Sequence, residues 1–485
     1  MAARPAFNIS IVVKFLVIVV WITFFGLLLK RDYLVESLEI KQVQALKRSN
    51  QESFLGVYFK DQRIGYVRNR FLHTESGDVD LEQDAFLLLN ILDKQHPVKL
   101  SGTARLSSKY LLKEFSFRFK APFSLMEVQG VVQGDTIELT VDTGKDLITD
   151  RIKLKNPPFL STNRRAYLLG EGLKPGDKVR VPYFDPFTLT VHSSVVEYRG
   201  RDKELIKGRI YNLHKFIENY SGIKVSSWLN DKGDVVKEES PAGFIFIAEP
   251  EFKATDVSRQ GAEVLSTVSV PLEGPMVDLA KRQRIVYQLG YPEDGDFSLD
   301  KDRQSLVGNL LTLEQEIMPA NDALVCSGQE SELQATPYIQ ANDQRIGTVV
   351  ASLDLAEASA TDKMRALSGW VFENLEKKPV IGIPDAVTTL VSGRGDCNEH
   401  AALFAALARN SGLPARIVAG VTLMEGAFYY HAWNEVCIDQ RWITLDTTKN
   451  QIPADLGHIK FVEGETGEQV KIGALLGNLR IEVVE

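Results

Sequence analysis

Residues 393–416 read GRGDCNEHAALFAALARNSGLPAR and join a glycine-rich turn to a run of strong helix formers. Asp396 suits the N-cap of a helix, and the Asn-Ser-Gly of residues 410–412 ends the run before a proline. The spacing predicts a helix over residues 398–410, with Cys397 at its first turn. Small alanines on the face below this cysteine predict close packing against a sheet.

The position of Cys397 bears on its chemistry. Unpaired N–H groups and the positive end of the helix macrodipole stabilise a thiolate at a helix N-terminus. We therefore expect a thiol pKa below the ordinary value, which would make Cys397 a nucleophile. The competing interpretation is that Cys397 is a small buried hydrophobe, as many cysteines are.

Two later segments offer a base and a group to orient it. HAWNEVCI (431–438) and RWITLD (441–446) have strand composition and are separated by a two-residue turn. Such a hairpin brings His431 beside Asp446, and a neighbouring carboxylate holds an imidazole in one tautomer. Together with Cys397, the pattern predicts a nucleophile, a base and an orienting acid.

Three blocks in this order, GRGDCNEHAALFAALARNSGLPARIVAGV, HAWNEV and WITLDTT, resemble the core of the transglutaminase-like superfamily. The resemblance covers roughly residues 340–450. It implies a papain-like fold, in which a helix bearing the cysteine packs on an antiparallel sheet bearing His and Asp. It also implies a triad of Cys397, His431 and Asp446, with Trp433 as a candidate wall of the substrate pocket. The backbone N–H of Cys397 is the expected oxyanion donor.

The resemblance implies an enzyme that forms an acyl-thioester from a peptide or protein amide. Transfer to water would make it a cysteine protease or amidase, and transfer to an amine would make it an acyltransferase. We predict no metal and no other cofactor, because no clustered ligands and no EF-hand spacing occur. The alternative is a non-catalytic envelope scaffold whose β-rich region binds a partner or a ligand.

Other polar residues near these blocks have simpler interpretations. His400 lies one helical turn from the thiol, where a packing role is expected. Glu435 shares a strand face with His431 and is expected to be solvated or paired. With three cysteines, no disulfide framework is predicted, and Cys326 and Cys437 are expected in the core. His458, in a loop-like tail, has no predicted role.

The rest of the 485-residue chain divides into further parts. Residues 51–250 alternate at period two, as in EFSFRFK and DTIELTVD, which predicts a large antiparallel β domain with one covered face. Its segment LKPGDKVRVPYFDPFTLTV resembles the half-barrels of bacterial envelope proteins. Residues 251–345 are interpreted as a β-rich connection. Residues 346–485 are the predicted catalytic domain, beginning with a helix capped at Thr361, so the predicted class is α+β.

Residues 1–30 are predicted to be an uncleaved membrane anchor. Positions 9–29 are predominantly apolar with one charge, Lys14, long enough to span a bilayer, and no small-residue cleavage site follows. Residues 31–50 have the composition of a helical stalk. The Lys and Arg count after the anchor favours a cytoplasmic body, whereas the signal-like layout and the half-barrel resemblance favour export. We predict a single-pass inner-membrane protein with a periplasmic body.

The net charge of −8, with no Lys/Arg block, argues against a nucleic-acid partner.

Overall fold

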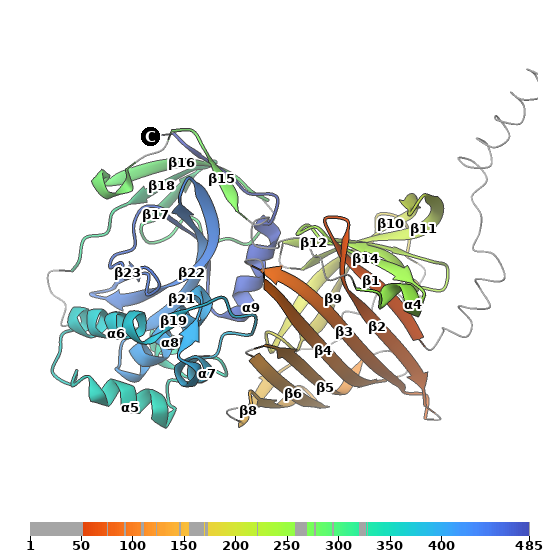
Figure 1. The fold of residues 1–485 in the computed structure, drawn as a ribbon, viewed down its shortest axis with the longest axis horizontal. Coiled ribbons are helices and arrows are strands. Elements are labelled where there is room, and N and C mark those ends of the chain that lie inside the picture. The colour runs from red at the N-terminus through yellow and green to blue at the C-terminus, as the bar shows by residue number, and fades with distance from the viewer. Residues whose placement is uncertain are drawn as a thin grey trace, which may run out of the picture.

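The computed structural model describes residues 52–484, apart from residues 75, 92–93, 108–110, 123, 145–146, 155–168, 170–172, 221, 258–268, 276–277, 293–294, 320–325 and 327. Two bodies lie side by side, a curved sheet and a second sheet covered by helices (Figure 1). The α+β class fits the second body, but the described chain as a whole is mostly β with few helices.

The first sheet consists of two antiparallel meanders that meet through β1 and β14, in the order β8-β7-β6-β5-β4-β3-β2-β1-β14-β13-β12-β11-β10-β9. Its first meander contains β1 (Glu52–Phe59), β2 (Gln62–His73), β3 (Val79–Ile91), β4 (Lys94–Leu106), β5 (Leu112–Ala121), β6 (Ser124–Gln133), β7 (Thr136–Asp142) and β8 (Leu147–Lys153). Its second contains β9 (Lys178–Asp185), β10 (Thr190–Ile206), β11 (Arg209–Tyr220), β12 (Ile223–Leu229), β13 (Val235–Glu239) and β14 (Phe244–Glu249), followed by the short helix α4 (Glu251–Ala254).

The period-two pattern sets which face of the first sheet is covered. Phe115 and Phe119 of β5 are buried, with Phe117 packed against the same core, and Ile137 and Leu139 of β7 are buried too, while the alternate residues Ser116 and Arg118 are exposed. The same core includes Phe184 from the second meander, so the curved sheet packs partly on itself. The predicted antiparallel sheet with one covered face is confirmed.

The second sheet combines two regions of the chain, in the order β17-β18-β16-β25-β15-β22-β21-β24, with β23 paired to β22. From the predicted connection come β15 (Val270–Glu273), the 3₁₀ turn η2 (Leu279–Lys281), β16 (Arg284–Gly290), β17 (Gln304–Val307) and β18 (Leu310–Glu314). From the C-terminal region come β21 (Ala415–Met424), β22 (Ala427–Ile438), β23 (Arg441–Leu445), β24 (His458–Glu463) and β25 (Arg480–Val483). Residues 251–345 therefore complete the sheet of the C-terminal region.

Helices cover one side of this sheet (Figure 1). They are α5 (Gln344–Ser352), α6 (Ala360–Asn374), α7 (Ala386–Ser392) and α8 (Cys397–Asn410), preceded by the 3₁₀ turn η3 (Glu330–Leu333) and followed by α9 (Thr466–Gln469) and η4 (Val470–Leu475). The predicted cap of α6 is wrong, because Ser359 accepts the capping hydrogen bond and Thr361 is buried in the first turn. The helix predicted over 398–410 is confirmed as α8.

The two bodies contact each other through residues that precede α7 in the sequence. Tyr338 donates its hydroxyl to the carbonyl of Phe187 at 2.6 Å, and its ring belongs to the core of the first sheet. Ile381 and Ile383 pack against the same core. The segment that leads into α7 is therefore held by the first sheet.

The predicted anchor (residues 1–30) and stalk (31–50) lie outside the described residues. Among residues 52–484, as far as they are described, no helix is both long and apolar enough to cross a membrane.

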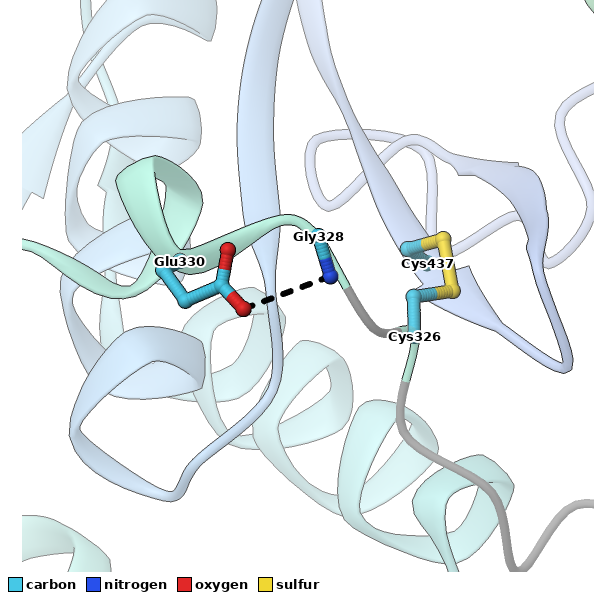
Figure 2. Close-up of a disulfide and its surroundings, with 4 residues drawn as sticks. All are labelled: Cys326, Gly328, Glu330 and Cys437. Atoms are coloured by element: carbon cyan, nitrogen blue, oxygen red, sulfur yellow. Dashed lines mark hydrogen bonds between the residues drawn. A yellow bond between two sulfur atoms is a disulfide. The ribbon is translucent and has the colours of Figure 1, made fainter.

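A disulfide joins Cys326 to Cys437, 111 residues apart (Figure 2). It ties the segment before η3 to the end of β22. Both cysteines are buried, as expected, but their pairing was not predicted, because a contact this distant in sequence leaves no local signal. Cys397 is consequently the one free cysteine among the three in the sequence.

The disulfide predicts a thiol count. The unreduced chain, denatured in guanidinium chloride and treated with Ellman's reagent, should release one equivalent of chromophore, and three after prior reduction. A Cys397→Ala variant should release none before reduction. Three reactive thiols in chain prepared without reductant under oxidising conditions would contradict the pairing.

Candidate active site

The head of α8 is closed by a reciprocal capping box. An Asp396 oxygen accepts from the backbone N–H of Asn398 at 3.0 Å, and a Glu399 oxygen accepts from the backbone N–H of Asp396 at 3.0 Å. These bonds satisfy the N–H groups around Cys397. Among the described residues no partner is recorded for the N–H of Cys397 itself, which leaves it open to a ligand.

The Cys397 thiol lies against strand β22. The residue is half-buried and packs on the same core as Ala432, the neighbour of His431, whose backbone N–H favours the charged form of the sulfur. Burial raises the pKa of the thiol well above its ordinary value, and the carboxyl groups of Asp396 and Glu399 raise it further. The predicted lowering of this pKa is wrong, chiefly because the thiol is buried and also because the capping box places acidic side chains where the helix end would otherwise be positive.

His431 and Asp446 meet as the hairpin predicts. Strand β22 turns at Asp439 and Gln440 into β23, and Asn434 pairs with Leu445, the last residue of β23. His431 Nε2 lies 2.9 Å from Asp446 Oδ2. His431 is largely buried and Asp446 fully buried, so this contact forms away from bulk water.

The other oxygen of Asp446 is held by a turn. Oδ1 accepts from the backbone N–H of Thr448 at 2.8 Å, from the Thr448 hydroxyl at 2.5 Å and from the backbone N–H of Lys449 at 3.2 Å. The carboxylate therefore has a fixed plane.

Burial and hydrogen bonding set the charges of this pair. Burial lowers the pKa of His431, and this outweighs the opposing effect of Asp446. Burial alone would raise the pKa of Asp446, but hydrogen bonds from His431 and His458 outweigh it and hold the pKa far below the ordinary range. At neutral pH the resting site thus combines a thiol, a neutral imidazole and a carboxylate.

Trp433 lies behind His431. Its ring stacks on the His431 ring with centroids 6.1 Å apart, and its side chain is 1% exposed. Trp433 therefore packs against the His431 imidazole and helps to hold it in place.

His458 was not expected near the site, yet it is a neighbour of the pair. It begins β24, is fully buried, and its Nε2 lies 3.1 Å from Asp446 Oδ2. Its Nδ1 lies 2.8 Å from Asp455 Oδ1. The strand composition of HIKFVE was the available sequence signal, but pairing of β24 with β21 brings His458 to Asp446 and cannot be inferred locally.

Two other polar residues are placed away from the reacting groups. His400 Nδ1 lies 2.7 Å from the carbonyl of Asp396, which agrees with a packing role. Glu435 is buried and ion-paired with Arg416 at 2.5 Å and Lys460 at 2.9 Å. Its expected pairing is confirmed, but it lies inside the protein.

Within the part of the chain that the structure describes, two groups of side chains are spaced closely enough to be considered for a metal. Ligand atoms of His431, Asp446 and His458 lie within 4.8 Å of one another, but the distances to Asp446 are those of hydrogen bonds. The acidic group around Glu435 already holds Arg416 and Lys460 as its cations. We interpret both as hydrogen-bonded networks.

Comparison with known proteins agrees with this geometry. The family model described as "Transglutaminase-like superfamily" matches residues 348–447. No curated protein matches the chain.

Three solved structures are similar to parts of the chain. A candidate cysteine protease from Cytophaga hutchinsonii is 17% identical over 41% of this chain and 83% of its own, with a TM-score of 0.28. A β-barrel-like protein of unknown function from Brucella abortus is 11% identical over 41% of this chain and 94% of its own (TM-score 0.33). A candidate protease from Parabacteroides distasonis is 10% identical over 69% of this chain and 68% of its own (TM-score 0.19).

The family match spans all three sequence blocks, and the fold places a cysteine-bearing helix on a sheet that carries histidine and aspartate. The resemblance inferred from the sequence is confirmed, and the C-terminal region is a transglutaminase-like domain.

Proposed function

We propose that the transglutaminase-like domain is a cysteine hydrolase or acyltransferase that acts on peptide or protein amides. Cys397 is the nucleophile, His431 the base and Asp446 the group that orients it. The observation that carries the proposal is the 2.9 Å contact between His431 and Asp446, made next to Ala432, which packs in the same core as Cys397.

The hydrogen bonds support one path for the proton. Nε2 of His431 faces Asp446, so Nδ1 is the nitrogen left to take the thiol proton. Proton transfer accompanies attack of the sulfur on the amide carbon, because the resting pair is uncharged. His431 then returns the proton to the leaving amine, and the acyl group remains on sulfur as a thioester.

The open N–H of Cys397 suits the charge that develops on the carbonyl oxygen. The capping box holds this turn rigid and satisfies the adjacent N–H groups. A fixed donor aimed at a developing oxyanion stabilises the transition state without reorganisation. Water or an amine then attacks the thioester, which gives hydrolysis or transamidation from one intermediate.

We also propose that the enzyme is anchored in the inner membrane by residues 1–30, with its body outside the cytoplasm. The Cys326–Cys437 disulfide supports this side, since structural disulfides persist in oxidising compartments and are rare in the cytosol.

A non-catalytic scaffold is the second candidate, and one feature favours it. The outer face of the first sheet carries an open groove of about 670 Å³, whose lining includes Phe54, Tyr66 and Phe86 with charged residues around them. Half-buried aromatic side chains in a groove suit a bound ligand. On this alternative the sheet binds a partner and the triad is inert.

Substitution of the triad separates the two candidates. Fluorogenic peptide amides report hydrolysis, and incorporation of a dansylated amine into casein reports transfer. Cys397→Ala and His431→Ala should lower either rate about 10³-fold or more, because triad members act as a unit. Asp446→Asn should also lower it strongly, though by less than loss of the nucleophile, because the amide cannot accept hydrogen bonds at both positions and no longer fixes the tautomer of His431.

His214→Ala is the matched control, since His214 lies in the first sheet and contacts Tyr198 and Asp231 there. It should keep the full rate. Activity that survives in Cys397→Ala would rule out the proposed nucleophile, and a complete absence of turnover in the wild type on both assays would favour the scaffold.

The raised pKa of Cys397 predicts a pH dependence for its alkylation. A raised pKa keeps the sulfur protonated at neutral pH, so the iodoacetamide rate should climb steadily between about pH 7 and 10. His431→Ala should lower the rate at pH 7, where the imidazole acts as base. A rate that is already constant below pH 7 would indicate a preformed thiolate and contradict the resting state described here.

A further inference from the structure

The groove of about 670 Å³ on the outer face of the first sheet is crossed by one row of side chains. The register of β2 to β5 places four lining residues in this row, each directly opposite the next, namely Tyr66, Phe86, Lys99 and Lys120. Directly opposed residues of neighbouring strands lie on the same face of a sheet. The row therefore leads from two aromatic rings to two ammonium groups.

The two ammonium groups at the end of the row are not neutralised. Lys99 and Lys120 are exposed, and within the described part of the chain neither side chain forms an ion pair or a hydrogen bond. Like charges directly opposite each other destabilise a pair of strands. Two positive charges therefore lie side by side, with a repulsion that a bound anion would relieve.

The neighbouring row on the same face shows the contrast, because its charges are paired. Arg68 contacts Glu52 at 2.5 Å and Asp84 at 3.1 Å, and Arg118 contacts Glu127 at 2.8 Å. Both arginines line the groove as well. The unmatched positive charge of the groove is therefore confined to the two lysines.

The other end of the row offers aromatic surface. The ring centroids of Tyr66 and Phe86 are 6.1 Å apart, and both side chains are half-buried. Such rings provide contact area for a flat or apolar group. Glu251, a further acid of the lining, belongs to α4, which packs on β1, β2 and β14 at this aromatic end. An anionic group is thus favoured at the lysines and disfavoured at α4.

We propose that this groove binds an amphipathic anion, whose apolar or aromatic body lies on Tyr66 and Phe86 and whose carboxylate or phosphate contacts Lys99 and Lys120. Neighbouring strands are about 4.8 Å apart, so the centres of the aromatic pair and of the lysine pair are separated by about 10 Å. The ligand therefore has its charge about 10 Å from the middle of its apolar body. The site uses no residue of the triad, so this inference goes beyond the proposed function and does not depend on it.

The test is photo-crosslinking of the full, oxidised chain with 4-benzoylbenzoate, an aromatic anion of this kind, followed by peptide mapping. Its uncharged amide, 4-benzoylbenzamide, is the matched probe. The anion should label the strands that carry Tyr66 and Phe86, and the labelling should saturate. Phenyl phosphate or phenylacetate should compete, and the stronger competitor identifies the preferred anionic group.

Removing the two positive charges should abolish the preference for the anion. Lys99→Gln combined with Lys120→Gln should lower labelling by 4-benzoylbenzoate about tenfold or more, because charge-assisted hydrogen bonds are lost, and leave labelling by the amide unchanged. Lys94→Gln combined with Lys153→Gln is the matched control. It removes the same charge from exposed positions of β4 and β8 outside the groove lining, and should label like the wild type.

Thermal unfolding separates binding from folding. The Lys99 and Lys120 double variant should melt no lower than the wild type without ligand, since it loses only a repulsion. Saturating 4-benzoylbenzoate should raise the melting temperature of the wild type and not that of the variant. Equal labelling of the groove by the amide, unchanged labelling in the double variant or a lack of competition by both anions would overturn the proposal. Cys397→Ala should label like the wild type, so loss of catalysis and loss of this site are separate results.

Discussion

The burial of helix α8 is the constraint on which the site depends. From Ala401 to Ala408 its residues are at most 1% exposed, because α5, α6 and α7 cover it and β22 lies beneath. Alanines at this contact let the helix axis approach the strand closely, as interiors packed to crystal density require. Asn434 of β22 reinforces the contact by donating to the Ala401 carbonyl at 3.0 Å. This close packing and the Asn434 hydrogen bond fix the position along β22 at which α8 begins. Cys397, at the start of the helix, therefore lies beside Ala432.

The side chains of strand β22 alternate between the face that packs against α8 and the opposite face. Ala432 and Val436 face α8 and belong to its core, whereas His431, Trp433 and Glu435 alternate with them on the opposite face. That second face is buried too, so each polar group on it requires a partner. Glu435 has Arg416 and Lys460, and His431 has Asp446. Because breaking one member of a buried ion pair leaves an uncompensated charge, this face tolerates few substitutions.

Local signals sufficed to predict α8, the hairpin and the pairing of His431 with Asp446, because each depends on residues close in sequence. The two-residue turn fixes the register of β22 against β23, and the register brings the two side chains together. The Cys326–Cys437 disulfide, the pairing of β24 with β21 and the addition of β15–β18 to the sheet depend on contacts far apart in sequence. The prediction for the pKa of the Cys397 thiol was wrong for a different reason. Burial of the thiol disfavours the thiolate, and Asp396 and Glu399 already occupy the N–H groups of the helix end beside Cys397.

The first sheet has a mechanical connection to the nucleophile. Ile381 and Ile383 pack in its core, and the chain on either side of them leads to β19 (Glu376–Lys377) and to α7. Lys377 of β19 pairs with Gly395 of β20 (Arg394–Gly395), which directly precedes the Asp396 cap and Cys397. The turn that presents the thiol is thus held between α8 and a segment anchored in the other sheet. A displacement of that anchor would move the cap before it moved His431 or Asp446, which are held by β22, β23 and the turn at Thr448. The first sheet therefore helps to set the distance between Cys397 and His431.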